Sequence, residues 1–327
     1  MRLAVLLVLL LATAAAVAWW WLQRPLNLAS PGVELSIETG SNPREIAQAW
    51  VDAGVMSSPA LLYEWFRWSG QARKIRAGSY EIHAGATPRS LLEKMVQGRE
   101  TLESVRFIEG WTLRQLRTEL ARAPQLKPAT AELSDEQLMA ALGEPGVPAE
   151  GRFFPDTYAY SRGVSDLTVL RRAHRSMQQR LAEVWAERDA TSPLKSPQDA
   201  LTLASIVEKE TGRAADRGLM AGVFANRLRI GMPLQTDPTV IYGLGAAFDG
   251  NLRKRDLLAD TPFNTYTRGG LPPTPISLPG LASMRAAVRP EATRALYFVA
   301  RGDGSSVFSE TLAEHNRAVN KYQRSGR

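Results

Sequence analysis

Two glutamates, Glu208 and Glu210, stand near the end of a segment that the sequence predicts to be a helix, Ser196–Thr211. A Ser-Pro pair suited to a helix start opens this segment. At about 100° per residue, Glu210 shares a face with three aliphatic side chains, those of Leu203, Ile206 and Val207. Burial against aliphatic groups raises the pKa of a carboxyl, and a general acid needs a carboxyl that stays protonated. Glu210 is therefore the candidate general acid. The alternative is an ordinary charged helix end, a position that the helix dipole disfavours for a carboxylate.

Polar side chains that follow this helix form a candidate binding surface. A turn before Pro238 displays polar residues, and a loop rich in Pro and Gly runs from residue 262 to 280. Asn, Gln, Thr and Tyr on rigid loops suit recognition of hydroxyl and acetamido groups, although they also populate ordinary turns. The candidate substrate-binding residues are Glu208, Gln235, Thr236, Asp237, Tyr242, Asn264, Tyr266 and Tyr158.

Two of these candidates have plain structural alternatives. Tyr158 closes a dense aromatic turn, residues 150–158, which is either a packed loop or part of a cleft wall. Glu208 falls on the side of the predicted helix opposite Glu210, near Ser205. There it should ionise and hydrogen-bond either a loop or the substrate.

The composition excludes several kinds of site. The chain has 327 residues and no cysteine, which rules out disulfide scaffolds, thiol catalysis and cysteine-ligated metals. Its three histidines are widely spaced, so we expect no metal centre and no cofactor. A net charge of +7 suits an anionic partner such as nucleic acid, anionic lipid or an acidic cell-wall polymer.

The N-terminus narrows that choice. From Leu3 to Leu22 the chain is apolar except for one threonine, and three tryptophans close the run. About 20 such residues can cross a bilayer as one helix, with aromatic residues at its interface. The alternative is a cleaved signal peptide, because Ala16–Ala18 resembles a cleavage site. We favour a retained anchor, since cleavage there would leave the tryptophans exposed. Both readings export the body, which disfavours nucleic acid as the partner.

The remaining segments indicate an α+β fold. Three stretches share a strand end, a Gly turn and a helix-capping residue, at Asn42, Thr87 and Thr112, and they predict small βα units. Between the first two units lies an apolar helical stripe, expected to pack in the core, of Leu61, Leu62, Trp65 and Phe66. Further predicted elements are helices at Asp135–Leu142, Leu167–Arg188 and from Thr311, and a β-hairpin over 297–308.

Long ordered motifs resemble the endolytic murein transglycosylase family (YceG-like). The segments that carry the resemblance are Ala204–Thr211, Asn226–Met232, Leu234–Gly243, Phe263–Tyr266, Gly270–Pro273, Phe107–Gly110 and Glu150–Tyr158. The resemblance implies an N-terminal transmembrane helix, a small βα LysM-like subdomain, and a mainly helical catalytic domain with lysozyme-like elements and a C-terminal β-hairpin. The implied boundaries are an anchor at 1–22, a linker at 23–33, the LysM-like part at 34–105 and the catalytic domain at 106–327.

The resemblance also implies an activity. The family cleaves the β-1,4 bond between N-acetylmuramic acid and N-acetylglucosamine in nascent peptidoglycan strands and leaves 1,6-anhydro ends. The second glutamate of the Glu-Lys-Glu motif, Glu210, is then the catalytic residue. We expect glycan strands and membrane-bound peptidoglycan synthases as partners. The expected location is the inner membrane, with the body of the chain in the periplasm.

Two other functions stay open on the sequence. Glu208 and Glu210 are two residues apart and cannot face each other on a helix, so they are not the carboxylate pair of an ordinary glycosidase. A two-carboxylate hydrolase would need Asp237 or Asp156 as its base. The other possibility is a non-catalytic protein that binds wall glycan and uses the Glu-Lys-Glu helix as scaffold.

Overall fold

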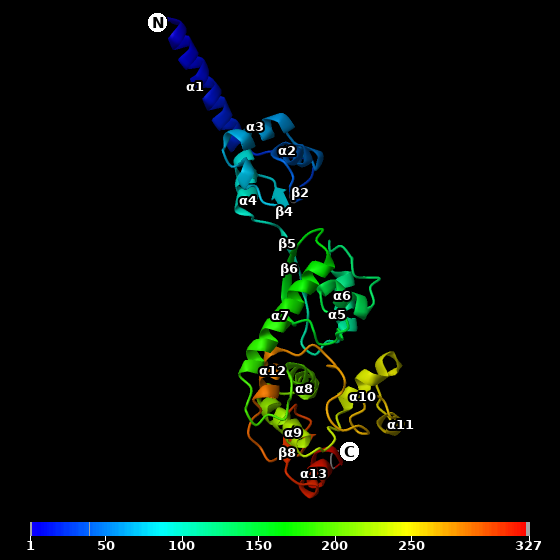
Figure 1. Ribbon diagram of the computed structural model, residues 1–327. Helices are drawn as coiled ribbons and strands as arrows, with labels where there is room; N and C mark the ends of the chain where they lie inside the picture. The colour runs from blue at the N-terminus through cyan, green and yellow to red at the C-terminus, as the bar shows by residue number, and fades with distance from the viewer. Residues whose placement is uncertain (1, 39, 325–327) are drawn as a thin grey trace. The chain divides into compact units, whose positions relative to one another are not determined.

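The computed structural model describes residues 2–38 and 40–324, and the chain divides into two compact units (Figure 1). The N-terminal unit holds the residues up to Ser104 together with Pro124–Lys127 and Ala159–Val164. The C-terminal unit holds Val105–Ala123, Pro128–Tyr158 and the chain from Ser165 onward. No local signal in the sequence indicated the two short segments that return to the N-terminal unit.

The N-terminal unit is built from an antiparallel strand pair and helices. Its elements are α1 (Arg2–Gln23), β1 (Asn27–Leu28), β2 (Gly32–Ile37), α2 (Pro43–Asp52), β3 (Val55–Met56), α3 (Pro59–Trp68), β4 (Gly78–His83) and α4 (Pro88–Gln97). β2 pairs with β4, with Gly32 opposite His83 and Ile37 opposite Gly78, and β1 pairs with β3. Strands β5 (Leu102–Arg106) and β6 (Thr157–Ser161) pair with each other, and both run across the boundary between the units.

The predicted helix starts are confirmed. Asn42, Thr87 and Thr112 are the N-caps of α2, α4 and α5 (Leu113–Arg122), and each forms a reciprocal capping box with the third helical residue. Each box satisfies backbone N–H groups that would otherwise lack partners at a helix start. The local sequence therefore determined where these three helices begin.

Helix α1 is long and apolar enough to cross a membrane. Its apolar window, residues 5–23, has a mean hydropathy of 2.3 and is not buried by the rest of the protein. By length and composition alone, such a helix also fits a signal sequence. Trp21 at the end of this helix packs against the core of the N-terminal unit, and both alternatives keep this contact because the Ala16–Ala18 site precedes it.

The segment expected to be a linker, residues 23–33, is part of the fold. It contains β1 and the start of β2, and Leu26 within it is buried. The backbone N–H of Leu26 donates to the Ala86 carbonyl oxygen at 2.7 Å. A chain paired in this way is not a flexible spacer, so α1 is joined closely to the N-terminal unit.

The core of the N-terminal unit differs from the predicted stripe at one position. Leu62 and Phe66 are fully buried with Trp50, while Trp65 is half-buried and Leu61 is 53% exposed. The interpretation of Leu61 as a core residue was therefore wrong. The fully buried face of α3 is narrower than the pattern suggested, because Leu62 and Phe66 lie inside the core whereas Trp65 packs against it only partly buried.

The C-terminal unit is mainly helical. Its elements besides α5 are α6 (Asp135–Leu142), α7 (Asp166–Ala186), α8 (Pro197–Glu210), α9 (Arg217–Arg229), α10 (Asp237–Leu244), α11 (Lys254–Leu258), α12 (Leu281–Val288), β7 (Tyr297–Ala300), β8 (Ser306–Ser309) and α13 (Leu312–Val319). The predicted helices at 135–142 and 196–211 and the hairpin β7–β8 are confirmed.

Helix α8 is the centre of this unit (Figure 1), where α7, α9, α10 and α12 contact it. Every residue from Ala200 to Val207 is buried, not just one apolar face. The Ser205 hydroxyl within this run is satisfied: it donates to the Thr202 carbonyl oxygen at 2.7 Å and accepts from the Ile276 N–H at 3.0 Å. A helix buried all round is a core helix, which a one-face interpretation does not capture.

Glycine at position 151 is required by two separate constraints. Gly151 has φ 78°, and a Cβ there would lie 2.5 Å from Pro275 Cβ. Gly143 has φ 94° with no atom within 4 Å of such a Cβ.

Gly143→Ala should therefore cost only left-handed backbone strain, about 1–2 kcal/mol, and Gly151→Ala should cost overpacking in addition, about 1–3 kcal/mol. Thermal unfolding of the detergent-solubilised chain checks this. Equal melting temperatures for the two variants would contradict the clash.

Candidate active site

Glu210 is the last residue of α8, where the buried helix reaches its rim. The Thr236 hydroxyl donates a hydrogen bond to the Glu210 carboxylate. Burial is the main cause that raises the pKa of Glu210, and nearby Asp237 raises it further. The Thr236 hydrogen bond and the Arg227 charge act in the opposite direction. The expectation of a desolvated Glu210 carboxyl is confirmed, although its partners come from loops rather than from the aliphatic face alone.

Two loops are joined next to this carboxyl. The Gln235 N–H donates to the Thr265 carbonyl oxygen, and the Thr236 N–H donates to the Thr265 hydroxyl, both at 3.1 Å. Gln235 has φ 48°, a left-handed conformation that few residues other than glycine adopt. Such strain persists only where the surroundings hold it, and it often marks a functional position. The exposed Gln235 side chain therefore lies on a fixed backbone beside Glu210.

Asp237 and Tyr266 form the second polar pair of the site. The Tyr266 hydroxyl donates to Asp237 Oδ1 at 2.6 Å. The pKa of Tyr266 is raised above its usual value, first by burial and then by Asp237 and Glu210. The structure thus brings four of the predicted residues to Glu210, namely Gln235, Thr236, Asp237 and Tyr266.

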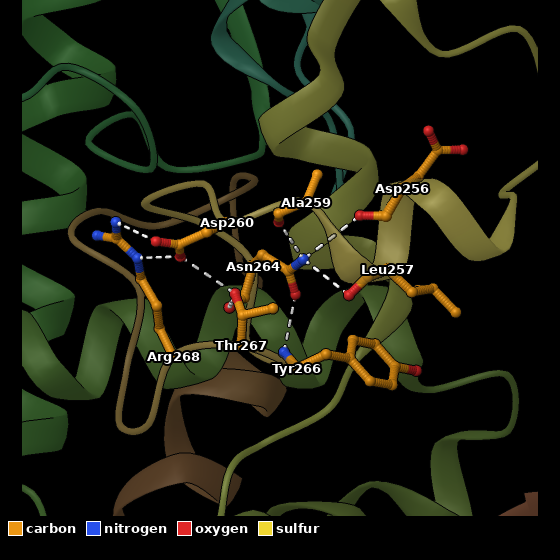
Figure 2. Close-up of polar contacts among 8 residues, drawn as sticks. All are labelled: Asp256, Leu257, Ala259, Asp260, Asn264, Tyr266, Thr267 and Arg268. Carbon is orange, nitrogen blue, oxygen red and sulfur yellow. Dashed lines mark hydrogen bonds and ion pairs between the residues drawn. The ribbon is translucent and has the colours of Figure 1, made fainter.

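Asn264 serves the loop instead (Figure 2). Its side chain is fully buried, and its amide nitrogen lies 2.6 Å from the Ala259 carbonyl oxygen and 3.1 Å from that of Leu257. Its amide oxygen accepts from the Tyr266 N–H at 2.9 Å. Contact between this amide and a substrate would require the loop to rearrange. Asn264 therefore positions Tyr266.

Arg227 is a buried cation that the sequence analysis did not select. Its guanidinium donates to the carbonyl oxygens of Leu296 at 2.6 Å and Leu234 at 2.7 Å. A buried guanidinium is costly unless it is hydrogen-bonded, so these contacts fix the loop that leads to Gln235. The local signal was weak: Arg227 follows the apolar run Met220–Ala225, but the neighbouring Asn226 and Arg229 do not distinguish it.

Glu208 takes part in a different contact. Its carboxylate accepts from the N–H of Gly280, the N-cap of α12, at 2.9 Å. Negative charge is favourable at a helix N-terminus. Burial raises the pKa of the neighbouring Glu109, and the charge of Glu208 adds to this effect. Of the two expected uses of Glu208, the structure shows the loop contact.

Tyr158 and Tyr242 form hydrogen bonds with residues other than Glu210. The Tyr158 hydroxyl donates to the Phe154 carbonyl oxygen at 2.7 Å, and its ring packs on Phe107 with centroids 5.2 Å apart. The aromatic turn is a packed loop at Tyr158. The Tyr242 hydroxyl donates to Glu150 Oε2 at 3.2 Å.

Glu150 is a buried carboxyl that the sequence analysis placed in a motif without assigning it a role. It is 8% exposed and accepts from the Leu113 N–H at 3.0 Å, at the start of α5. Burial raises its pKa to about 7, against the hydrogen bonds from Leu113, Tyr242 and Gly151. Glu150 thus joins α5 to α10, the helix that begins at Asp237.

The geometry supports acid–base chemistry at a single carboxyl. Glu210 is desolvated, and hydroxyl groups and an exposed amide lie beside it. Across residues 2–38 and 40–324, no three His, Asp or Glu side chains gather as a metal-binding group. Asp156, the other candidate base of a two-carboxylate hydrolase, lies in the aromatic turn, where its carboxylate accepts from the Thr157 N–H at 2.7 Å.

Comparison with known proteins gives consistent matches. The model of the YceG-like family matches residues 35–321. A Bacillus subtilis endolytic murein transglycosylase is 33% identical over 89% of this chain and 84% of its own length. A Streptococcus pneumoniae protein of the same name is 26% identical over 88% of this chain and 58% of its own. The crystal structure of a YceG-like protein from Listeria monocytogenes aligns with a TM-score of 0.57 and 29% identity, over 88% of this chain and 98% of that one.

The raised pKa of Glu150 predicts a pH-dependent stability. Glu150 keeps its proton up to about pH 7 in the folded state, whereas its ordinary value is 4.5. Between these values the folded state binds more protons than the unfolded state, so stability falls as pH rises, by up to about 3 kcal/mol. Glu150→Gln should remove this decline. Unfolding measured at pH 4.5 and pH 8 checks it, with the exposed Glu132→Gln as a control for the lost charge. A decline unchanged in Glu150→Gln would refute the assignment.

Proposed function

Because the chain belongs to the YceG-like family, we propose that it is an endolytic murein transglycosylase. It cleaves the β-1,4 bond between N-acetylmuramic acid and N-acetylglucosamine within peptidoglycan strands. The observation that carries this proposal is the desolvated Glu210 carboxyl at the end of α8, held by the Thr236 hydroxyl. Relatives that carry the name of this activity support it along most of the chain.

The reaction needs one carboxyl that first gives and then takes a proton. Protonated Glu210 donates to the glycosidic oxygen as the bond from this oxygen to C1 of N-acetylmuramic acid breaks. The 6-hydroxyl of the same sugar attacks C1 and returns its proton to the Glu210 carboxylate. The product then carries a 1,6-anhydro end, and no water is consumed. The raised pKa of Glu210 favours the protonated form that the first step requires.

We divide the polar residues around Glu210 into those that contact the substrate and those that hold the site in place. We assign substrate contact to Gln235, whose exposed side chain lies on a fixed backbone, and to the Asp237–Tyr266 pair. Thr236 tunes Glu210, and Asn264 and Glu208 hold loops. Tyr242 is assigned to the hydrogen bond that holds Glu150, and Tyr158 is assigned to packing of the aromatic turn.

Location and partners follow from the anchor and the activity. The apolar helix α1 supports attachment to a membrane, and we assign it to the inner membrane with the body in the periplasm. Peptidoglycan strands made at that membrane, and the synthases that make them, are the proposed partners. The paired strands β2 and β4 have two helices between them, α2 and α3, which the short strand β3 separates, and this order supports the LysM-like assignment of residues 34–105, with glycan binding as its role.

Glu210→Gln is the direct test of the mechanism. The amide keeps the shape of the side chain but has no transferable proton, so turnover should fall by at least about 10²–10⁴ with folding retained. Glu208→Gln is the matched control and should keep more activity or lose it together with melting temperature. Mass spectrometry of digested glycan strands measures both. Normal anhydro product from Glu210→Gln would end the proposal.

The same digest separates a second candidate function. Asp237 lies close enough to Glu210 to raise its pKa, so a two-carboxylate hydrolase is the alternative that the structure favours. A hydrolase leaves reducing N-acetylmuramic acid ends, because water attacks C1. Reducing ends as the main product of the native enzyme would select that alternative.

Thr236→Val tests how Glu210 is tuned. The Thr236 hydrogen bond favours the charged carboxylate and lowers the pKa of Glu210, so its loss should raise that pKa. Activity that needs the protonated acid falls as pH rises through this pKa, and the alkaline limb of the pH–rate profile should therefore move to higher pH. Thr118→Val, at an exposed position in α5, is the isosteric control. A limb that stays in place or moves to lower pH would contradict the assignment.

A further inference from the structure

An apolar groove of about 750 Å³ lies between α1 and α3 in the N-terminal unit. Figure 1 shows α3 beside the end of α1 that enters this unit. Groove residues used below are Leu10, Trp20, Leu61, Glu64, Trp65 and Trp68. The groove therefore begins on a helix that is apolar enough to cross a membrane and ends on a helix of the folded unit.

The α3 side of the groove exposes large apolar side chains. Trp68 is 76% exposed and Leu61 is 53% exposed. Each is costly in water, and together they extend the exposed apolar surface of α1, on which Trp20 is 52% exposed. Neither Leu61 nor Trp68 is needed for the core, which uses Leu62 and Phe66.

The polar atoms of this surface already have partners. The indole N–H of Trp68 donates to Glu64 Oε2 at 3.0 Å, and that of Trp65 donates to the Pro88 carbonyl oxygen at 3.0 Å. Glu64 is the charged residue of the groove, and Arg67 pairs with it at 3.2 Å. A surface with satisfied N–H groups and a neutralised carboxylate suits an apolar environment with a polar border.

The length of the groove along α1 matches the thickness of one leaflet of a bilayer. It reaches along α1 from Leu10 to Leu22, about 18 Å of helix at 1.5 Å per residue. Half of a hydrocarbon core is about 15 Å thick. If α1 spans the membrane, the groove lies in the leaflet next to the N-terminal unit. The guanidinium of Arg24 lies 4.0 Å from the Trp20 ring, at the level where lipid headgroups would begin.

We propose that α3 and the second half of α1 form one membrane-embedded surface, and that lipid of this leaflet fills the groove between them. This inference rests on the membrane attachment in the proposed function. Trp65 and Trp68 then lie at the interface, as aromatic side chains do at the ends of membrane helices. The N-terminal unit is held against the bilayer by two helices rather than tethered by one.

The absence of native cysteine makes the test site-specific. Single cysteines at Leu10, Leu61, Trp68 and Gln97 carry a nitrobenzoxadiazole label in the full chain. Each variant is reconstituted in vesicles of phosphatidylethanolamine and phosphatidylglycerol, with and without nitroxide-labelled lipid. Gln97 is the aqueous control, because it is exposed at the far end of α4 from Pro88, about 13 Å along that helix.

Labels at Leu61 and Trp68 should be quenched several-fold more than the label at Gln97, with the label at Leu10 as the reference for insertion of α1. Quenching at Leu10 with none at Leu61 and Trp68 would overturn the proposal and leave the anchor intact. That pattern would also be the outcome if a second protein helix, rather than lipid, occupied the groove. Absence of quenching at Leu10 would instead show that α1 is not inserted, and both the anchor and this surface would fail. Neither outcome bears on cleavage by Glu210, which the glycan digest measures separately.

Discussion

Burial of α8 on every side is the constraint on which the C-terminal unit depends. The run Ala200–Val207 has no exposed residue, so a charge placed within it would lack both water and a partner. Its acidic residues lie outside this run, with Asp199 in the first turn and Glu208 and Glu210 in the last turn, where the helix leaves the core. Glu208 and Glu210 therefore lie where the rigid, buried part of α8 ends and the loops begin. The fold thereby determines both the position of the acid and its environment.

Opposing influences act on the pKa of the Glu210 carboxyl. Burial and Asp237 favour the neutral acid, while Thr236 and the guanidinium of Arg227 favour the carboxylate. The proposed reaction requires this carboxyl first to lose and then to regain a proton, which a group held in one protonation state could not do. The loops that supply Thr236 and Asp237 are themselves fixed by Thr265, so this balance is part of the scaffold rather than of one side chain.

Three glutamates of the C-terminal unit have different surroundings and thus different chemistry. Glu208 accepts from the N–H group at the start of α12, and Glu150 accepts from the start of α5. Both stabilise contacts between elements, although only Glu150 is deeply buried. Glu210 accepts from a side-chain hydroxyl and lies beside exposed polar groups. Residue type alone does not distinguish these roles, because the partner and the extent of burial decide them.

The sequence by itself determined the local elements and the location of the acid. Capping residues at Asn42, Thr87 and Thr112 specify helix starts through nearest-neighbour hydrogen bonds, which depend on few residues. Helical spacing placed Glu210 at the end of the predicted helix 196–211, which agrees with α8. Only the tertiary structure decided which polar residues reach that acid, because these contacts join segments far apart in the chain. Asn264 is sealed within its loop, Glu150 and Arg227 hold the site together, and Leu61 faces outward. Periodicity gives the side of a helix on which a residue lies, but what covers that side depends on long-range packing.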